Sequence, residues 1–186
     1  MGDGHMQNDR KIYTSRPEKL LDCDQKEIYD CLEKLGLEFE RMDRIESDNV
    51  DENVYKILGI RRLKNLLLCN ASRTNFYLLI MTADVPFKSA VLSAQLGTSR
   101  FKFAPEEYLK ELIHAKPGTS SILGLIFDKE KKVQLLIDEL VLEQKYFGCL
   151  PCCDDTSLKF DTKQLLEKLL EYTGHAYTVV KMQANS

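Results

Sequence analysis

Apolar residues recur along this chain with two different periods, and each period predicts one kind of element. Spacings of three and four residues predict helices at residues 87–96 and 105–114. They also predict one helix, or two short ones, at residues 17–35, where Asp24 is the expected cap of the second part. A shorter helix through Val54 and Leu58 has Asn49 or Asp51 as its expected N-cap. The last long helix is expected to start at Asp161 or Thr162. Glycines that fit the C-terminal end of a helix follow four of these segments, at positions 36, 59, 97 and 174.

Short apolar runs and alternating stretches predict the strands. We expect strands at residues 37–42, 63–69, 76–81, 100–103, 122–127, 133–137, 146–151, 157–160 and 177–181. The runs at 63–69 and 76–81 are separated by a short polar connection, which favours their pairing. Because strands fill the middle of the chain and helices flank them, the pattern predicts one α/β domain with a mixed, curved sheet.

Length and charge narrow the possible classes of protein. The chain has 186 residues, enough for one domain with a substantial core, and a net charge of −3. Any contact with nucleic acid must therefore come from a local basic patch. No apolar run approaches about 18 residues, so we expect no membrane span and no signal peptide. Residues 1–6 look like a cloning remnant, so we expect a disordered lead-in over 1–15 and the domain at 16–182.

The six cysteines are too few for a disulfide scaffold, which favours reduced thiols in the cytoplasm. Cys149 and Cys152 have the spacing of a redox pair or half of a zinc site. A structural zinc site needs a second pair of ligands, and Cys23 and Cys31 lie on a predicted helix and do not supply one. A thiol or zinc protein remains an alternative interpretation.

The stretch from Ala115 to Asp128 combines a turn with an apolar run. Pro117 fixes its own φ, and Gly118 permits a positive φ or a close approach of the backbone. A tight loop before a rigid strand can point several N–H groups in one direction and so hold a carbonyl or an oxyanion. The alternative is an ordinary turn between a helix and a strand.

Several short motifs occur in a fixed order. They are Gly59-Ile-Arg-Arg-Leu-Lys64-Asn65-Leu66, Phe76-Tyr-Leu-Leu-Ile-Met81, Leu96-Gly97, Phe101-Lys-Phe-Ala-Pro105, Lys116-Pro-Gly118 and Gly124-Leu-Ile-Phe-Asp128. In their order and spacing, over roughly residues 20–180, the chain resembles the YbaK and prolyl-tRNA synthetase editing-domain family. It is most similar to the freestanding prolyl-type members, which are trans-editing aminoacyl-tRNA deacylases. The resemblance implies a partly barrel-like mixed sheet with helices around one mouth.

The resemblance also implies a set of site residues. Lys64, with Asn65 beside it, would lie in the editing pocket near the terminal adenosine or the attacking water. An ammonium there would stabilise a developing oxyanion, although a lysine that opens a buried strand usually reaches out to solvent instead. Backbone N–H groups of the following loop would polarise the ester carbonyl. In this loop the expected catalytic residues are Gly118 and Ser121, and the expected substrate-binding residues are Thr119, Ser120 and Gly124.

One position departs from the family pattern. Freestanding prolyl-type members usually carry a His-Pro pair followed by Asn before the late strand, where this chain has Leu150, Pro151 and Asp154. Leucine cannot donate, accept or titrate, whereas Asp154 could pair with a substrate ammonium. Neither His114 nor His175 is an obvious replacement, because each is expected to be a surface or structural histidine.

The resemblance implies tRNA as the partner, and prolyl-tRNA synthetase as a possible second one, for a monomer or weak dimer. Basic side chains from segments around the expected pocket mouth could contact acceptor-stem phosphates. These residues are Arg61, Arg62, Lys88, Arg100, Lys102 and Lys116.

The expected activity is hydrolysis of mischarged tRNA, Ala-tRNA(Pro) above all, with no metal or cofactor. The competing hypothesis is a non-catalytic member that binds aminoacyl-tRNA or an amino acid as a sensor, which Leu150 favours.

Overall fold

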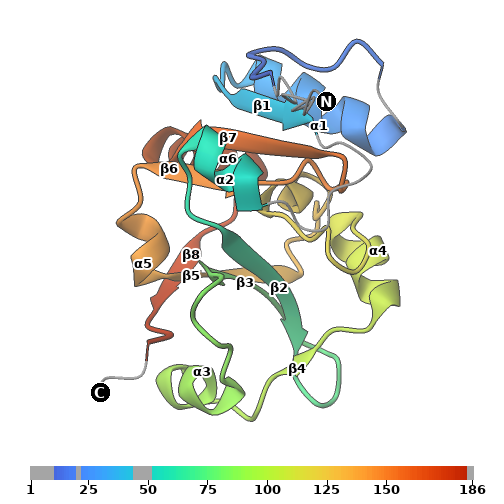
Figure 1. The fold of residues 1–186 in the computed structure, drawn as a ribbon. Helices are drawn as coiled ribbons and strands as arrows, with labels where there is room; N and C mark the ends of the chain where they lie inside the picture. The colour runs from blue at the N-terminus through green and yellow to red at the C-terminus, as the bar shows by residue number, and fades with distance from the viewer. Residues whose placement is uncertain (1–10, 20–21, 44–51, 184–186) are drawn as a thin grey trace, which may run out of the picture.

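The computed structural model describes residues 11–19, 22–43 and 52–183, in which helices surround two sheets (Figure 1). In chain order the elements are α1 (Cys23–Lys34), β1 (Glu40–Asp43), α2 (Glu52–Leu58), β2 (Leu63–Cys69), β3 (Phe76–Thr82), α3 (Ser89–Leu96), β4 (Lys102–Phe103), α4 (Glu106–Ile113), the 3₁₀ helix η1 (Ile122–Ile126), β5 (Val133–Asp138), α5 (Glu139–Leu142), β6 (Tyr146–Cys149), β7 (Thr156–Asp161), α6 (Thr162–Thr173) and β8 (Tyr177–Val180). None of the described helices is long and apolar enough to cross a membrane.

The larger sheet has the strand order β4-β2-β3-β5-β8, and the smaller sheet has the order β1-β7-β6. In the larger sheet, β2 is antiparallel to β3 and β4, whereas the β3–β5 and β5–β8 pairs are parallel. The expected α/β class with a mixed sheet flanked by helices is therefore confirmed. The described strands divide between two open sheets, so the curvature falls short of a closed barrel.

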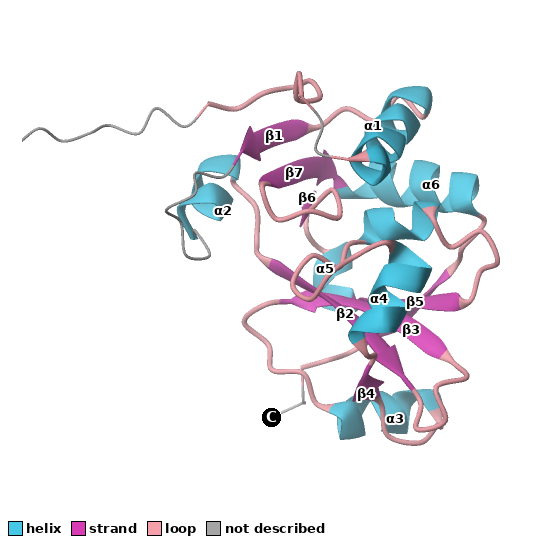
Figure 2. Cartoon of the chain, turned by 90° about the vertical axis from the view of Figure 1, so that its right-hand side faces the viewer, coloured by secondary structure: helices cyan, strands magenta, loops and turns pink. Residues whose placement is uncertain are grey.

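Both faces of the larger sheet are covered. Leu67 and Leu78 pack into the main core, which α1, α4, η1, α6 and the smaller sheet complete. Figure 2 shows α4 lying in front of this sheet. On the opposite face, Leu68 and Leu79 pack with Leu92 of α3. Successive residues of a strand point to opposite faces, so β2 contributes alternately to the two cores.

The strand expected at residues 122–127 is wrong, because this segment forms the 3₁₀ helix η1. All five of its residues are buried, and an apolar run that is buried on every side carries no period that separates strand from helix. The Ser121 hydroxyl caps η1 by accepting a hydrogen bond from the N–H of Leu123 at 3.2 Å. Gly124 lets η1 approach α4, since an added Cβ would lie 2.7 Å from the carbonyl oxygen of Ile113.

The other predicted helices are found, with small shifts at most ends, but α1 begins at Cys23, six residues later than the expected start at residue 17. Asp22 rather than Asp24 caps α1, and its carboxylate accepts a hydrogen bond from Gln25 N–H at 2.8 Å. Asp161 caps α6 in the same way. The expected caps of α2 lie outside the described residues. Helix α5 was not predicted, because four residues between two strands carry too few apolar positions for a helical period.

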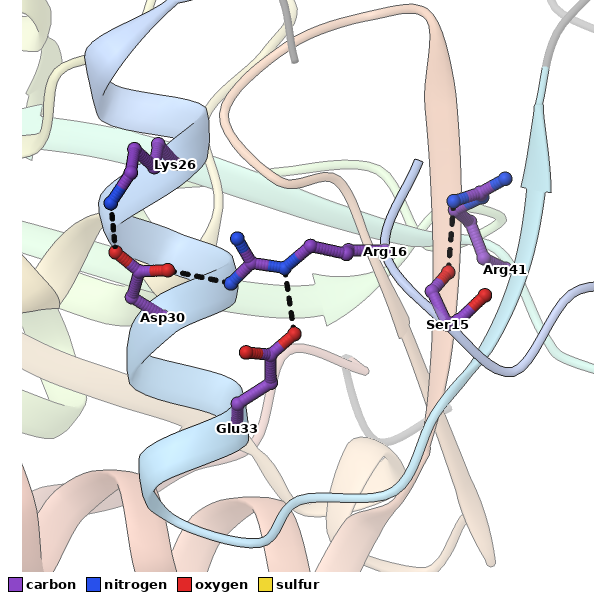
Figure 3. Close-up of polar contacts among 6 residues, drawn as sticks. All are labelled: Ser15, Arg16, Lys26, Asp30, Glu33 and Arg41. Atoms are coloured by element: carbon purple, nitrogen blue, oxygen red, sulfur yellow. Dashed lines mark hydrogen bonds and ion pairs between the residues drawn. The ribbon is translucent and has the colours of Figure 1, made fainter. Parts of the chain in front are cut away.

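The N-terminal segment packs against α1 and β1, as Figure 3 shows. The Arg16 guanidinium donates to Asp30 and Glu33 of α1, both at 2.6 Å. Arg41 of β1 donates to the carbonyl oxygen of Ser15 at 2.8 Å and pairs with Tyr13 through the backbone. Through these contacts Tyr13 and Ser15 are bound to Arg41 of β1. Residues 1–10 lie outside the described part.

Candidate active site

A cavity of about 390 Å³ lies beside the first half of β2, where the two sheets meet. It brings together five of the residues that the sequence singled out as catalytic or substrate-binding, namely Lys64, Asn65, Gly118, Ser120 and Leu150. They come from three segments that are far apart along the chain: β2, the loop after α4, and the end of β6. These five predicted residues therefore converge on one cavity.

The edge of β2 explains why a cavity forms there. Strand β4 pairs with β2 only at Leu68 and Cys69, so β4 does not cover residues 63–66 on that side. Gly148 of β6 in the smaller sheet and Leu150, which follows β6, also line the cavity. Gly148 has to be small, because an added Cβ would lie 2.5 Å from Cδ1 of Ile60, another lining residue.

Lys64 and Asn65 leave β2 on opposite faces, because consecutive strand residues alternate. Leu66 packs on the α3 side of the sheet, the side toward which Lys64 also projects. There the half-buried ammonium donates a hydrogen bond to the carbonyl oxygen of Val85 at 2.9 Å. The lysine thus lines the cavity and at the same time fixes the connection between β3 and α3.

The loop after α4 contributes Gly118 and Ser120 to the cavity wall. Gly118 has φ of +87°, a conformation that residues with a Cβ rarely adopt. The turn is closed by Thr119, whose N–H donates to the carbonyl of Lys116 at 3.0 Å and whose hydroxyl accepts from the Lys116 N–H at 2.9 Å. Within the described parts of the chain, the N–H groups of Gly118 and Ser120 donate to no protein acceptor. These two donors remain available to a ligand.

Two polar side-chain atoms at the cavity lack a partner. Oδ1 of Asn65 and Oγ of Ser157 are buried and make no hydrogen bond with any described residue. Buried polar groups are nearly always hydrogen-bonded, so these two oxygens are exceptions among the residues that line the cavity. The sequence pattern did not identify Ser157. It only placed this residue at the start of a strand, and its position beside β2 is a consequence of how the sheets meet.

Four other predicted site residues do not line the cavity. The Thr119 hydroxyl is used inside the turn, and the Ser121 hydroxyl caps η1. Gly124 packs against Ile113 of α4. Asp154 is exposed in the bend between β6 and β7. Thr119, Ser121 and Gly124 therefore shape the loop that presents Gly118 and Ser120.

The histidines and cysteines have structural surroundings. His114 stacks on Phe127 with a centroid distance of 4.0 Å, and buried His175 contacts Asp128 at 3.0 Å. Burial raises the pKa of the Cys149 thiol to about 12 and also raises the pKa of Cys152. In the described segments, no group of three or more His, Cys, Asp and Glu residues could hold a metal ion.

The expected basic patch divides into two groups. Arg62 lines the cavity, and Arg61 is paired with Asp84 at 2.6 Å beside it, while exposed Lys116 precedes Gly118 in the loop. The remaining residues lie at the other end of β2, near α3 and β4, and are Lys88, Arg100 and Lys102. Lys102 pairs with Cys69 of β2. Cys69 lies five positions after Lys64 on this strand, so the backbones of Lys64 and Cys69 are about 17 Å apart.

Comparison with known proteins decides the family. The aminoacyl-tRNA editing domain matches residues 52–168, which include every lining residue of the cavity. The chain belongs to the aminoacyl-tRNA editing domain family. The expected YbaK-like editing family is therefore confirmed.

Individual relatives of this editing domain agree with the assignment. This chain is 23% identical over 143 residues to the prolyl-tRNA editing protein ProX of Acetoanaerobium sticklandii, and the match covers 77% of this chain and 81% of the relative. It is 26% identical over 161 residues to prolyl-tRNA synthetase associated domain-containing protein 1 of Danio rerio, covering 84% and 86%. A crystal structure described as a candidate trans-editing enzyme for prolyl tRNA synthetase superposes with a TM-score of 0.64. That match covers 88% of this chain and 100% of the other at 15% identity, which supports the fold alone.

Proposed function

We propose that this protein is a deacylase that hydrolyses the ester of mischarged tRNA in trans, with Ala-tRNA(Pro) as its expected substrate. The observation that carries the proposal is the pair of unused N–H groups on Gly118 and Ser120 at the cavity wall. The family assignment supports aminoacyl-tRNA as the substrate class. The names of the two relatives favour tRNA(Pro) and make prolyl-tRNA synthetase a candidate partner in the cytoplasm. We assign the activity to a domain spanning residues 16–182.

The proposed reaction is the attack of water on the ester carbonyl, assisted by a free ribose hydroxyl of the substrate. The carbonyl oxygen becomes an oxyanion, which the N–H groups of Gly118 and Ser120 stabilise. The bond to the ribose oxygen then breaks, and that oxygen takes up a proton. The products are a free amino acid and uncharged tRNA. Each preorganised donor of this kind typically lowers the barrier by about 3 kcal/mol.

Lys64 and Asn65 would position the substrate. The Lys64 ammonium contributes positive charge at the cavity, where an oxyanion forms only in the transition state. The unpartnered Oδ1 of Asn65 can accept a hydrogen bond from water or from a ribose hydroxyl. Ser157 offers a second unpartnered hydroxyl in the same cavity.

Selection of the amino acid would rest on shape. Ile60 and Leu150 contribute apolar surface to the cavity, and neither can recognise a polar side chain. A difference of one methylene is worth only about 1–3 kcal/mol in an apolar pocket. Discrimination between alanine and proline therefore relies on steric exclusion of the larger residue.

A second candidate function is that of a sensor that binds aminoacyl-tRNA or an amino acid without turnover. The observation that favours it is Leu150, which lines the cavity where freestanding prolyl-type members usually carry a histidine. Leucine supplies no proton and no hydrogen bond at that position.

A panel of mischarged tRNAs separates the two functions. The purified protein would be mixed with each tRNA carrying a labelled amino acid, and release of the label would be timed. Faster release of alanine from tRNA(Pro) than in buffer supports the deacylase. Binding by filter retention together with release at the buffer rate would instead favour the sensor.

A further inference from the structure

Phe103 of β4 is the most exposed of the large apolar side chains in the described residues, with 63% of its surface accessible. It lies on the edge strand of the larger sheet. Its ring packs against that of Phe87, with centroids 5.6 Å apart and an interplanar angle of 59°. Phe101, only two residues earlier, is by contrast buried against Tyr77. The fold therefore buries one aromatic ring of this segment and leaves the other on the surface.

Three exposed basic side chains lie next to these aromatic residues in the sequence. Lys88 follows Phe87, while Arg100 and Lys102 flank Phe101. The Ser89 hydroxyl joins the two segments, accepting from the N–H of Phe101 at 2.8 Å. In the described chain, none of the three cations forms an ion pair, whereas the nearby carboxylates of Asp84 and Glu107 pair with Arg61 and Arg73.

The aromatic pair is connected to the cavity through the segment between β3 and α3. The Lys64 ammonium binds the carbonyl oxygen of Val85, and Val85 precedes Phe87 by two residues. Val85 and Phe87 pack on the same face of the larger sheet, the face from which Lys64 projects. Figures 1 and 2 both place β4 beside α3, at the end of β2 remote from α2. Phe103 pairs with Leu68, four positions along β2 from Lys64, so a ligand chain leaving the cavity along this face would reach Phe103 after about 14 Å.

We propose that Phe103, supported by Phe87, is a stacking platform for an unpaired base near the 3′ end of the bound tRNA. The inference rests on the proposed function, because it extends the same substrate outward from the cavity. Aromatic rings flanked by cations are the usual means of holding single-stranded nucleic acid, since every base has a face that stacks. Lys88, Arg100 and Lys102 would bind the adjoining phosphates. A base within the duplex stem is already stacked between its neighbours and cannot stack on Phe103, so the platform binds the single-stranded end.

Binding of two labelled RNA hairpins to the full chain tests this assignment. One hairpin copies the acceptor stem with an unacylated single-stranded CCA end, and the other has the same stem with a blunt end. Fluorescence anisotropy would compare wild type with Phe103→Ala, Phe103→Tyr and the control Val179→Ala, an exposed residue of the opposite edge strand. Each titration would be repeated at several salt concentrations.

We expect Phe103→Ala to weaken binding of the CCA hairpin about tenfold, which is the usual effect of removing one stacking ring. Its affinity for the blunt hairpin and its salt dependence should stay as in wild type. Phe103→Tyr should keep wild-type affinity. Lys102→Ala should instead reduce the slope of affinity against salt by about one unit, because one phosphate contact is lost.

The stacking platform is overturned if Phe103→Ala binds the CCA hairpin as wild type does, or weakens both hairpins equally. Kinetics on alanyl-minihelix separate this result from a failure of the proposed function. Turnover by wild type with an unchanged KM for Phe103→Ala would refute the platform alone. Loss of CCA binding in Phe103→Ala, with no turnover even by wild type, would refute the deacylase and retain the platform.

Discussion

The ammonium nitrogen of Lys64 lies 2.9 Å from the carbonyl oxygen of Val85. This contact joins the strand that forms one wall of the cavity to the connection that leads to Phe87 and α3. A charged donor on a main-chain carbonyl is stronger than a neutral one. The lysine is therefore held at the cavity rather than free in solvent.

Replacing Lys64 with alanine should abolish turnover, with a loss of at least about a hundredfold in kcat, because a preorganised charge at the oxyanion is removed. The circular dichroism spectrum should stay unchanged. Lys110→Ala, at an exposed position of α4, is the matched control and should keep wild-type kinetics. A Lys64→Ala variant with the wild-type rate would refute the assignment.

The backbone of Gly118 offers a second test with a matched control. An alanine there is strained by φ of +87° but meets no atom within 4 Å, and the same holds for Gly97 at φ of +62°. Both Gly→Ala variants should lose roughly 1–3 kcal/mol of stability in urea denaturation. Only Gly118→Ala should also lose about a hundredfold in kcat, since the loop amides shift. Equal kcat values for the two variants would exclude an oxyanion role for this loop.

Ser157 should separate function from stability. Its buried hydroxyl has no partner among the described residues, so Ser157→Ala should leave the free energy of unfolding unchanged or raise it. Ser93→Ala is the control. It removes a hydrogen bond of 3.1 Å to the carbonyl oxygen of Ser99 and should cost about 1 kcal/mol. We expect a higher KM for Ser157→Ala alone, measured on alanyl-tRNA. A destabilised Ser157→Ala with normal kinetics would show that this hydroxyl is purely structural.

Leu150→His restores the residue type that freestanding prolyl-type members carry. An imidazole at this cavity position can donate, accept and titrate near neutral pH. We expect faster deacylation or a changed amino-acid preference in the mischarged-tRNA panel. The same rate and the same preference as wild type would show that the position is silent.

The Cys149 thiol should be inert in the folded protein. Burial raises its pKa from about 9 to about 12, so very little thiolate exists at pH 8. Iodoacetamide should therefore label Cys149 roughly a thousandfold more slowly in the native than in the unfolded chain, measured by peptide mass spectrometry.

The same pKa shift has a consequence for stability. Below pH 9 both states keep the thiol protonated, whereas between pH 9 and pH 12 only the unfolded chain ionises. The contribution of Cys149 to stability should therefore fall as pH rises through this window. Native labelling of Cys149 at pH 8 within tenfold of the unfolded rate would contradict both expectations.

The sequence by itself determined the order of most elements, the ends of several helices and the family. These features are local: Asp161 caps α6 through its own neighbour Gln164, and the apolar periods of 63–69 and 76–81 predict the β2–β3 pair directly. The site residues Lys64, Asn65, Gly118, Ser120 and Leu150 came from motifs in a recognisable order. They were found because the family resemblance carries positions that local patterns do not.

Only the tertiary structure decided the rest. Residues 122–126 form η1, which is buried on every side and packs closely on Ile113 at Gly124, a contact that no periodicity encodes. Ser157 reaches the cavity because the smaller sheet brings β7 beside a strand about ninety residues earlier in the chain. The expected basic patch divides because its residues lie near opposite ends of β2: one end lines the cavity and the other pairs with β4 at Phe103. Pairing between distant segments sets all three outcomes, and such pairing depends on the packing of the whole chain rather than on any stretch of it.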